Sequence, residues 1–65
     1  MLEEHKGTIG EIIFHNNENG YTVAVFETEL EAFTIVGILP GVSVGRHYRL
    51  RGEFTMHPTY GEQFA

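Results

Sequence analysis

The chain is divided into short extended runs, each bounded by residues that favour turns. In residues 21–28 and 48–54, side chains alternate with a period of two, which is typical of strands with one buried face. Residues 27–32 are the best candidate for a helix, but they are few and carry no apolar stripe with helical spacing. The sequence therefore predicts an all-β structure in which residues 27–32 form a hairpin turn.

Four extended runs are followed by the beginning of a fifth. They span residues 6–15, 21–28, 32–39 and 47–55, and the last begins at residue 62. In the first run, alternation places Ile9 and Ile13 on one face. Ile12 and Phe14 then lie on the other face, and the glycines of this run permit a bend or a bulge.

Glycine, proline and asparagine mark the connections between the runs. Asn19-Gly20 is a strong signal for a tight hairpin, although the asparagines before it are also consistent with a longer loop. Pro40-Gly41 suits the central positions of a type II turn. The runs are therefore expected to be joined by short turns.

Short strands, frequent turns and glycines within the strands fit a small, strongly coiled barrel. The simplest such architecture is the oligonucleotide/oligosaccharide-binding (OB) fold, here a small OB-like five-stranded barrel. The run that begins at residue 62 has no length in which to pair, so we expect the last strand to be truncated. Residues 1–65 are thus expected to be a single domain and a fragment of a larger protein.

Composition excludes several classes of protein. The chain has no cysteine, which excludes disulfides and thiolate zinc sites, and no two of its four histidines have metal-binding helical spacing. No apolar run approaches the length of a membrane helix, and no signal peptide is visible, so a cytoplasmic location without membrane contact is expected. The net charge of −5 opposes non-specific binding of nucleic acid by the domain as a whole.

Catalytic patterns are also absent from the sequence. The single serine, Ser43, has no neighbouring base, and no glycine-rich loop precedes a helix to bind a phosphate. We therefore expect no enzymatic activity, no cofactor and no metal in this segment.

The basic residues are unevenly distributed, and this is the best signal for binding. Arg46, Arg49 and Arg51 lie within six positions of one another. Because side chains two apart on a strand share a face, Arg49 and Arg51 are expected to project together, where they can contact phosphates or stack on bases. The alternative is a solvent-facing strand whose arginines pair with glutamates of neighbouring strands.

The segment from His57 to Gly61 also has two interpretations. Proline and glycine explain it as a turn without any function. As a contact site, it would present His57 and Tyr60 to a nucleotide or a neighbouring domain. Tyr21 and the aromatic residues Tyr48, Phe54 and Phe64 are further candidates for stacking, although most of them are expected in the core.

Several segments match a known family in the same order along the chain. The early ones are Gly7-Thr8-Ile9, Ile13-Phe14-His15-Asn16 and Glu18-Asn19-Gly20-Tyr21-Thr22-Val23. The later ones are Val36-Gly37-Ile38-Leu39-Pro40-Gly41, Val44-Gly45, Leu50-Arg51-Gly52-Glu53-Phe54 and His57-Pro58-Thr59-Tyr60-Gly61-Glu62-Gln63-Phe64. Together they resemble the N-terminal region of RecD-like superfamily 1 DNA helicases, relatives of the exodeoxyribonuclease V alpha subunit that include the RecD/TraA-type group.

The resemblance implies an OB-like N-terminal domain in a longer helicase that uses ATP and Mg²⁺ to move 5′ to 3′ along single-stranded DNA. It also implies DNA repair or recombination as the context. The phosphate-binding sequence G-x-x-x-x-G-K-[ST] is absent from these residues, so ATP is expected to bind elsewhere in the larger protein.

Three hypotheses for the function follow. The first is a non-catalytic accessory domain that engages single-stranded DNA through Arg49 and Arg51, with Arg46, His57 and Tyr60 as weaker candidates, or that docks against the rest of the helicase. The second is a structural or protein-interaction module, in which an open terminal strand pairs two isolated fragments edge to edge. The third is a free-standing oligonucleotide-binding protein.

Overall fold

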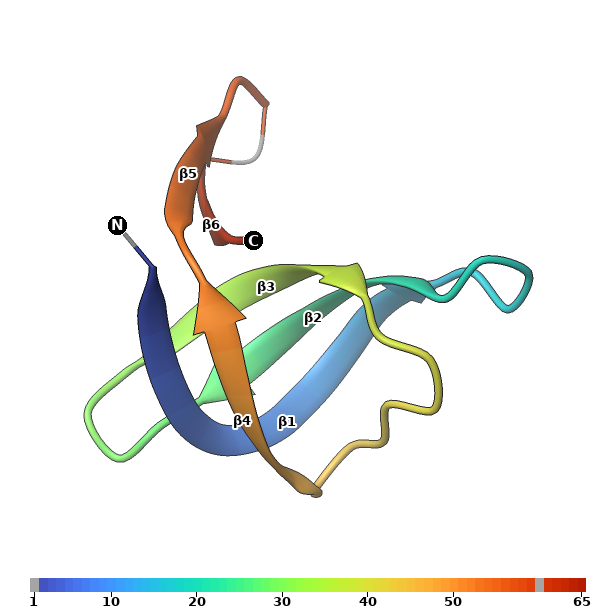
Figure 1. Cartoon of the computed structure of the whole chain (residues 1–65), viewed down its shortest axis with the longest axis horizontal. Coiled ribbons are helices and arrows are strands. Elements are labelled where there is room, and N and C mark those ends of the chain that lie inside the picture. Colours follow the sequence, from blue (N-terminus) through green and yellow to red (C-terminus); the bar gives the residue numbers. More distant parts are fainter. Residues whose placement is uncertain (1, 60) are drawn as a thin grey trace.

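The computed structural model of the chain describes residues 2–59 and 61–65, and its regular structure there is entirely β-strand (Figure 1). The strands are β1 (Glu3–His15), β2 (Tyr21–Glu27), β3 (Ala32–Ile38), β4 (His47–Gly52), β5 (Phe54–His57) and β6 (Gly61–Phe64). They form one sheet in the order β4-β1-β2-β3-β6-β5, in which only the β3–β6 pair is parallel. The predicted all-β class is confirmed.

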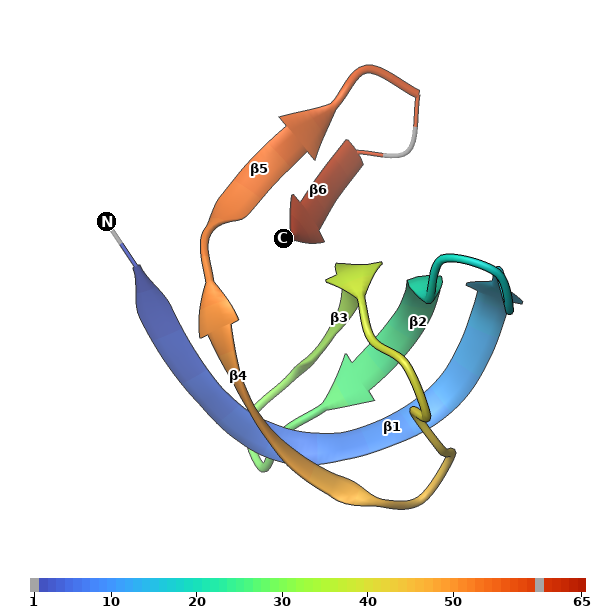
Figure 2. The ribbon, with the colours of Figure 1, turned by 45° about the vertical axis from the view of Figure 1, so that its right-hand side comes forward.

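The sheet curls around a core because its first strand is long and bent (Figure 2). The first half of β1 pairs with β4 and its second half pairs with β2. The two strands at the ends of the sheet order, β4 and β5, are consecutive in the chain and are separated only by Glu53. The result is a barrel-like sheet in which the described residues form no hydrogen-bonded ladder between the two end strands.

The core lies on the concave face of this sheet. Its buried apolar side chains are Ile9, Ala24, Phe26, Ile35 and Phe64. The half-buried Phe33 ring packs against two of these core residues: its centroid lies 5.7 Å from that of Phe26 and 5.6 Å from that of Phe64. In β2, Thr22, Ala24 and Phe26 are all buried, as the alternation predicts.

In β1 the predicted division of side chains between the two faces is wrong. Ile9 is buried and Ile12 packs against the core, whereas Ile13 and Phe14 are 56% and 51% exposed. The reason is two register irregularities against β2, one between Ile9 and Glu11 and one between Ile12 and Phe14. Each adds a residue to β1, which reverses the alternation beyond it. The bulge that the glycines were expected to permit is present at Gly10.

The end of the chain also differs from the prediction. The expected strand 47–55 ends at Gly52, because Glu53 exchanges two backbone hydrogen bonds with Ala65 (3.1 and 2.9 Å) and so begins the next ladder. The sequence also predicted that the last run would remain unpaired. This prediction is wrong. As β6 it pairs with β5 at four positions and with β3 at the Ile35–Phe64 pair, so it lies inside the sheet.

The connections follow the turn signals. Between β1 and β2 the chain forms the longer loop rather than a tight hairpin, with the Asn16 Oδ1 accepting hydrogen bonds from the backbone N–H groups of Glu18 and Asn19 (2.8 and 3.3 Å). Residues 27–32 form the predicted hairpin turn, in which the Thr28 hydroxyl accepts from two backbone N–H groups. Gly41 has a φ of +74°, which suits the second central position of a type II turn.

Candidate nucleic-acid interface

Strand β4 carries its arginines on the outer face of the sheet. Tyr48 and Leu50 point inward and pack against the core, while His47, Arg49 and Arg51 are exposed. The alternation that predicted a common face for Arg49 and Arg51 therefore holds in the structure. Regular pairing with β1 over six positions, without a bulge, preserves it.

The neighbouring strand adds a further cation that the sequence alone did not indicate. In the β1–β4 ladder, Lys6 lies directly opposite Arg49, and Thr8 lies opposite His47. Directly opposed residues of antiparallel strands share a face, so the Lys6 side chain stands beside the arginines. Its position in the sequence, 43 residues before Arg49, contains no signal of this contact, which depends on strand pairing.

We refer to Lys6, His47, Arg49 and Arg51, with Arg46 just before β4, as the basic face. It includes all four lysine and arginine residues of the chain. The backbone of Arg46 lies beside β1, because the Arg46 carbonyl accepts a hydrogen bond from the Ile9 N–H (3.3 Å). Three of the four lysine and arginine residues of a chain with a net charge of −5, namely Lys6, Arg49 and Arg51, thus project from one face of the sheet.

One arginine also forms the ion pair that the alternative interpretation predicts. The Arg49 Nε lies 3.6 Å from the Glu4 Oε1, and the two side chains are 65% and 38% exposed. Such an exposed pair contributes at most about 1 kcal/mol and is screened by salt. Within residues 2–59 and 61–65, Arg51 makes no ion pair. The arginines therefore remain accessible to an anionic ligand.

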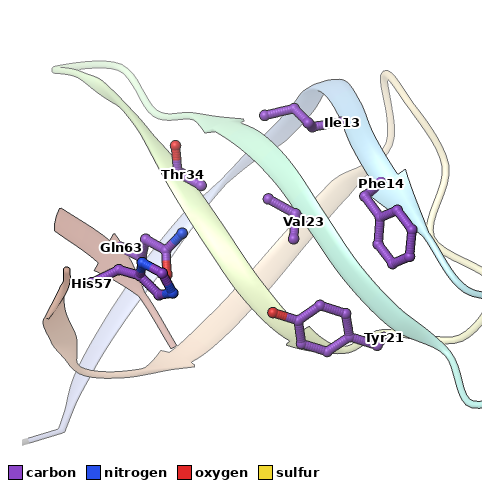
Figure 3. A pocket seen from close by; sticks show the side chains of 7 residues that line it. All are labelled: Ile13, Phe14, Tyr21, Val23, Thr34, His57 and Gln63. Atoms are coloured by element: carbon purple, nitrogen blue, oxygen red, sulfur yellow. The ribbon is translucent and has the colours of Figure 1, made fainter. Parts of the chain in front are cut away.

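A second feature lies on the outer face of β1–β3, at the end away from β4. It is a hollow of about 520 Å³, called here the apolar hollow. Its lining residues, drawn in Figure 3, are Ile13, Phe14, Tyr21, Val23, Thr34, His57 and Gln63. The rings of Phe14 and Tyr21 lie 6.2 Å apart between centroids, and Tyr21 is 39% exposed. No lysine or arginine lines it.

Of the weaker site candidates, Arg46 belongs to the basic face, whereas His57 does not. His57 lies at the end of β5 and lines the apolar hollow, and its Nδ1 accepts a hydrogen bond from the Thr59 N–H (3.0 Å), as the turn interpretation expects. Tyr60 lies outside the described residues. Tyr21 lies outside the core, because the alternation of β2 directs it to the outer face, whereas Tyr48, Phe54 and Phe64 contribute to the core, as expected for most of these aromatic residues.

Within residues 2–59 and 61–65, no three histidine or acidic side chains lie close enough together to hold a metal ion. In that part of the chain there is also no helix long and apolar enough to cross a membrane.

Comparison with known families gives a match over almost the whole chain. The model of the OB-fold domain of the ATP-dependent DNA helicase YrrC matches residues 2–65. The chain belongs to this family. The match confirms the prediction of an OB domain from a DNA helicase. A comparison with solved structures finds no match to the chain.

The domain has two outer surfaces of different chemistry. OB folds commonly bind oligonucleotides on the face of their second and third strands and on adjacent loops. In this chain the corresponding face of β2 and β3 contributes to the apolar hollow, while the cations lie on β1 and β4. The charge distribution thus separates a surface suited to phosphates from a surface suited to apolar groups.

Proposed function

We propose that this domain is a non-catalytic accessory module of an ATP-dependent DNA helicase, and that its basic face contacts the phosphates of single-stranded DNA. The observation that supports the proposal is that Lys6, Arg49 and Arg51, three of the four lysine and arginine residues of an acidic chain, project from one face of the sheet. Arginine and lysine on a strand face follow a phosphate backbone without reading its sequence. The module would therefore help to hold DNA at the helicase.

The larger protein supplies the chemistry in this proposal. ATP and Mg²⁺ would bind in motor domains outside these residues, since the sequence has no phosphate-binding G-x-x-x-x-G-K-[ST] segment. We further propose that the parent is of the RecD-like, exodeoxyribonuclease V alpha type, moves 5′ to 3′ and acts in DNA repair or recombination. The resemblance of the sequence supports this finer assignment.

The proposal predicts that Arg49→Ala/Arg51→Ala weakens binding to single-stranded DNA at least tenfold at low salt. Each phosphate contact on a single strand contributes about 0.7 to the slope of log affinity against log salt concentration, so losing two contacts lowers the slope by about 1.4. Fluorescence anisotropy of a labelled oligonucleotide, titrated at several salt concentrations, measures both quantities.

A matched control variant distinguishes the effect of the basic face on DNA binding from the effect of the net charge. Asn17→Glu/Leu30→Glu changes the net charge from −5 to −7, as the arginine double variant does, but at two exposed loop positions outside the basic face. The control is expected to keep most of the affinity and the full slope. Equal losses in the two variants, or no saturable binding by the parent chain, would reject direct contact through this face.

Docking against another part of the helicase is a second candidate function, favoured by the apolar hollow. Ile13, Phe14 and Tyr21 are exposed there, and uncharged apolar surface of this kind fits a protein better than a phosphate backbone. Ile13→Ser/Phe14→Ser is expected to reduce affinity for the separately produced remainder of the parent helicase at least tenfold, measured by calorimetry. Unchanged affinity, with DNA binding also unchanged, would exclude docking through the hollow.

A further inference from the structure

The outer face of β1 and β4 places a lysine directly opposite an arginine. In the β1–β4 ladder Lys6 pairs with Arg49, and the neighbouring outward pair is Glu4 with Arg51. All four residues are exposed. Like charges that lie directly opposite each other destabilise an antiparallel pair, whereas opposite charges stabilise it. The Lys6–Arg49 pair is therefore unfavourable for folding, and an anion placed between the two cations would relieve their repulsion.

Glu4 already serves one of these two cations. Its Oε1 lies 3.6 Å from the Arg49 Nε, although Arg51 is its direct partner in the ladder, so its side chain reaches diagonally across the strands. This distance is longer than a hydrogen bond, and an exposed pair of this kind is weak. Within residues 2–59 and 61–65, Lys6 forms no ion pair. The Glu4 carboxylate thus partly neutralises Arg49 and leaves Lys6 unsatisfied.

From this arrangement we propose that Lys6 and Arg49 bind one phosphate group between them, and that Glu4 competes with that phosphate for Arg49. The inference rests on the proposed function, since it takes the phosphate to be part of the backbone of single-stranded DNA. Phosphate oxygens can accept hydrogen bonds from an ammonium and a guanidinium group at once, and such charge-assisted bonds are stronger than a single loose ion pair. Glu4 therefore sets how much of the affinity of this site is retained.

The proposal requires stability and affinity to change in opposite directions. Replacing Glu4 by glutamine removes an attractive pair, so the urea midpoint of unfolding should fall slightly or stay the same, while the affinity for DNA rises. Replacing Lys6 by glutamine removes a repulsive pair, so the midpoint should stay the same or rise, while the affinity falls. A purely structural role of either residue would lower stability and affinity together.

The test measures fluorescence anisotropy of a labelled single-stranded oligonucleotide at low salt, with urea midpoints for every variant. Glu4→Gln is expected to raise the affinity about two- to fivefold, the range that corresponds to release of an exposed ion pair. Lys6→Gln is expected to lower the affinity at least about threefold, through loss of one charged contact.

A matched control and a double variant separate competition for Arg49 from the effect of net charge. Glu18→Gln makes the same change in net charge, from −5 to −4, at an exposed position of the β1–β2 loop. Figure 1 shows this loop and β4 on opposite sides of the molecule, so the affinity should change less than about 1.5-fold. In an Arg49→Ala chain, Glu4→Gln should lose most of its effect, because the carboxylate no longer has this cation to compete for.

Three results would overturn the proposal. They are equal gains from Glu4→Gln and Glu18→Gln, a Glu4→Gln gain that persists in full without Arg49, and unchanged affinity in Lys6→Gln. Sodium pyrophosphate, followed by the amide NMR shifts of residues 4–8 and 47–51, is the second probe. If pyrophosphate binds with the same order of variants but no chain binds the oligonucleotide, the phosphate site stands and the proposed contact with DNA fails. Absence of binding to both probes would reject both.

Discussion

Replacing Phe26 by alanine is expected to unfold the domain at 25 °C. Phe26 is fully buried in β2, and its ring packs against Phe33 at the centre of the core. Removing a buried phenylalanine side chain costs about 3–5 kcal/mol, through lost burial and the cavity that remains. A single core in a chain of this size supplies no more than about 3–5 kcal/mol of net stability. The change therefore removes most or all of the free energy of unfolding.

The measurement is urea denaturation followed by circular dichroism, with amide NMR spectra in the absence of urea. Phe26→Ala should give the narrow amide dispersion of an unfolded chain, with no cooperative transition. Leu30→Ala is the control, because Leu30 is also apolar but is 93% exposed in the β2–β3 turn. Its effect should be within about 0.5 kcal/mol. A native urea midpoint for Phe26→Ala would show that the core is not centred on this residue.

The second large effect is expected from a single added methyl group at Gly7. Gly7 lies where β1 passes from its pairing with β4 to its pairing with β2. A β-carbon there would overlap the backbone carbonyl of Glu27, and the Phe26 ring is only 3.1 Å from the same position. Relief requires β1 and β2 to separate, so Gly7→Ala is expected to cost about 2–3 kcal/mol, at the upper end of the range for overpacking.

Gly10→Ala is the matched control for this prediction, since both glycines belong to β1 and both face Glu27. At Gly10, however, the atoms nearest to an added β-carbon belong to the Glu27 carboxylate, the mobile end of an exposed side chain. That carboxylate can move aside, so the loss of stability should stay below about 1 kcal/mol. Equal urea midpoints for the two variants would contradict a close main-chain contact at Gly7.

Where strands pair regularly, local alternation was enough to assign side chains to faces. This holds for β2, whose buried Thr22, Ala24 and Phe26 follow the pattern, and for β4, where Arg49 and Arg51 share the outer face. It does not hold for β1, because a bulge is a property of two paired strands and reverses every face beyond it. The exposure of Phe14, and with it the apolar hollow, was consequently missed.

The residues of the candidate site were likewise predictable only in part. Arg46, Arg49 and Arg51 are close in sequence, so a local pattern reveals them. Lys6 joins them only through the register of β1 with β4, and His57 is directed into a different surface by the path of β5. How far β6 runs along β3 is likewise a matter of strand pairing, which no local pattern encodes.

Period-two alternation and turn residues are short-range properties, and by themselves they determined the all-β class, the hairpin turn at residues 27–32 and the common face of Arg49 and Arg51. The tertiary structure decided the bulges, the pairing of β6 inside the sheet and the addition of Lys6 to the basic face. Each of these depends on which strands become neighbours and in what register. That choice is made by the burial of the whole core, to which residues from all parts of the chain contribute.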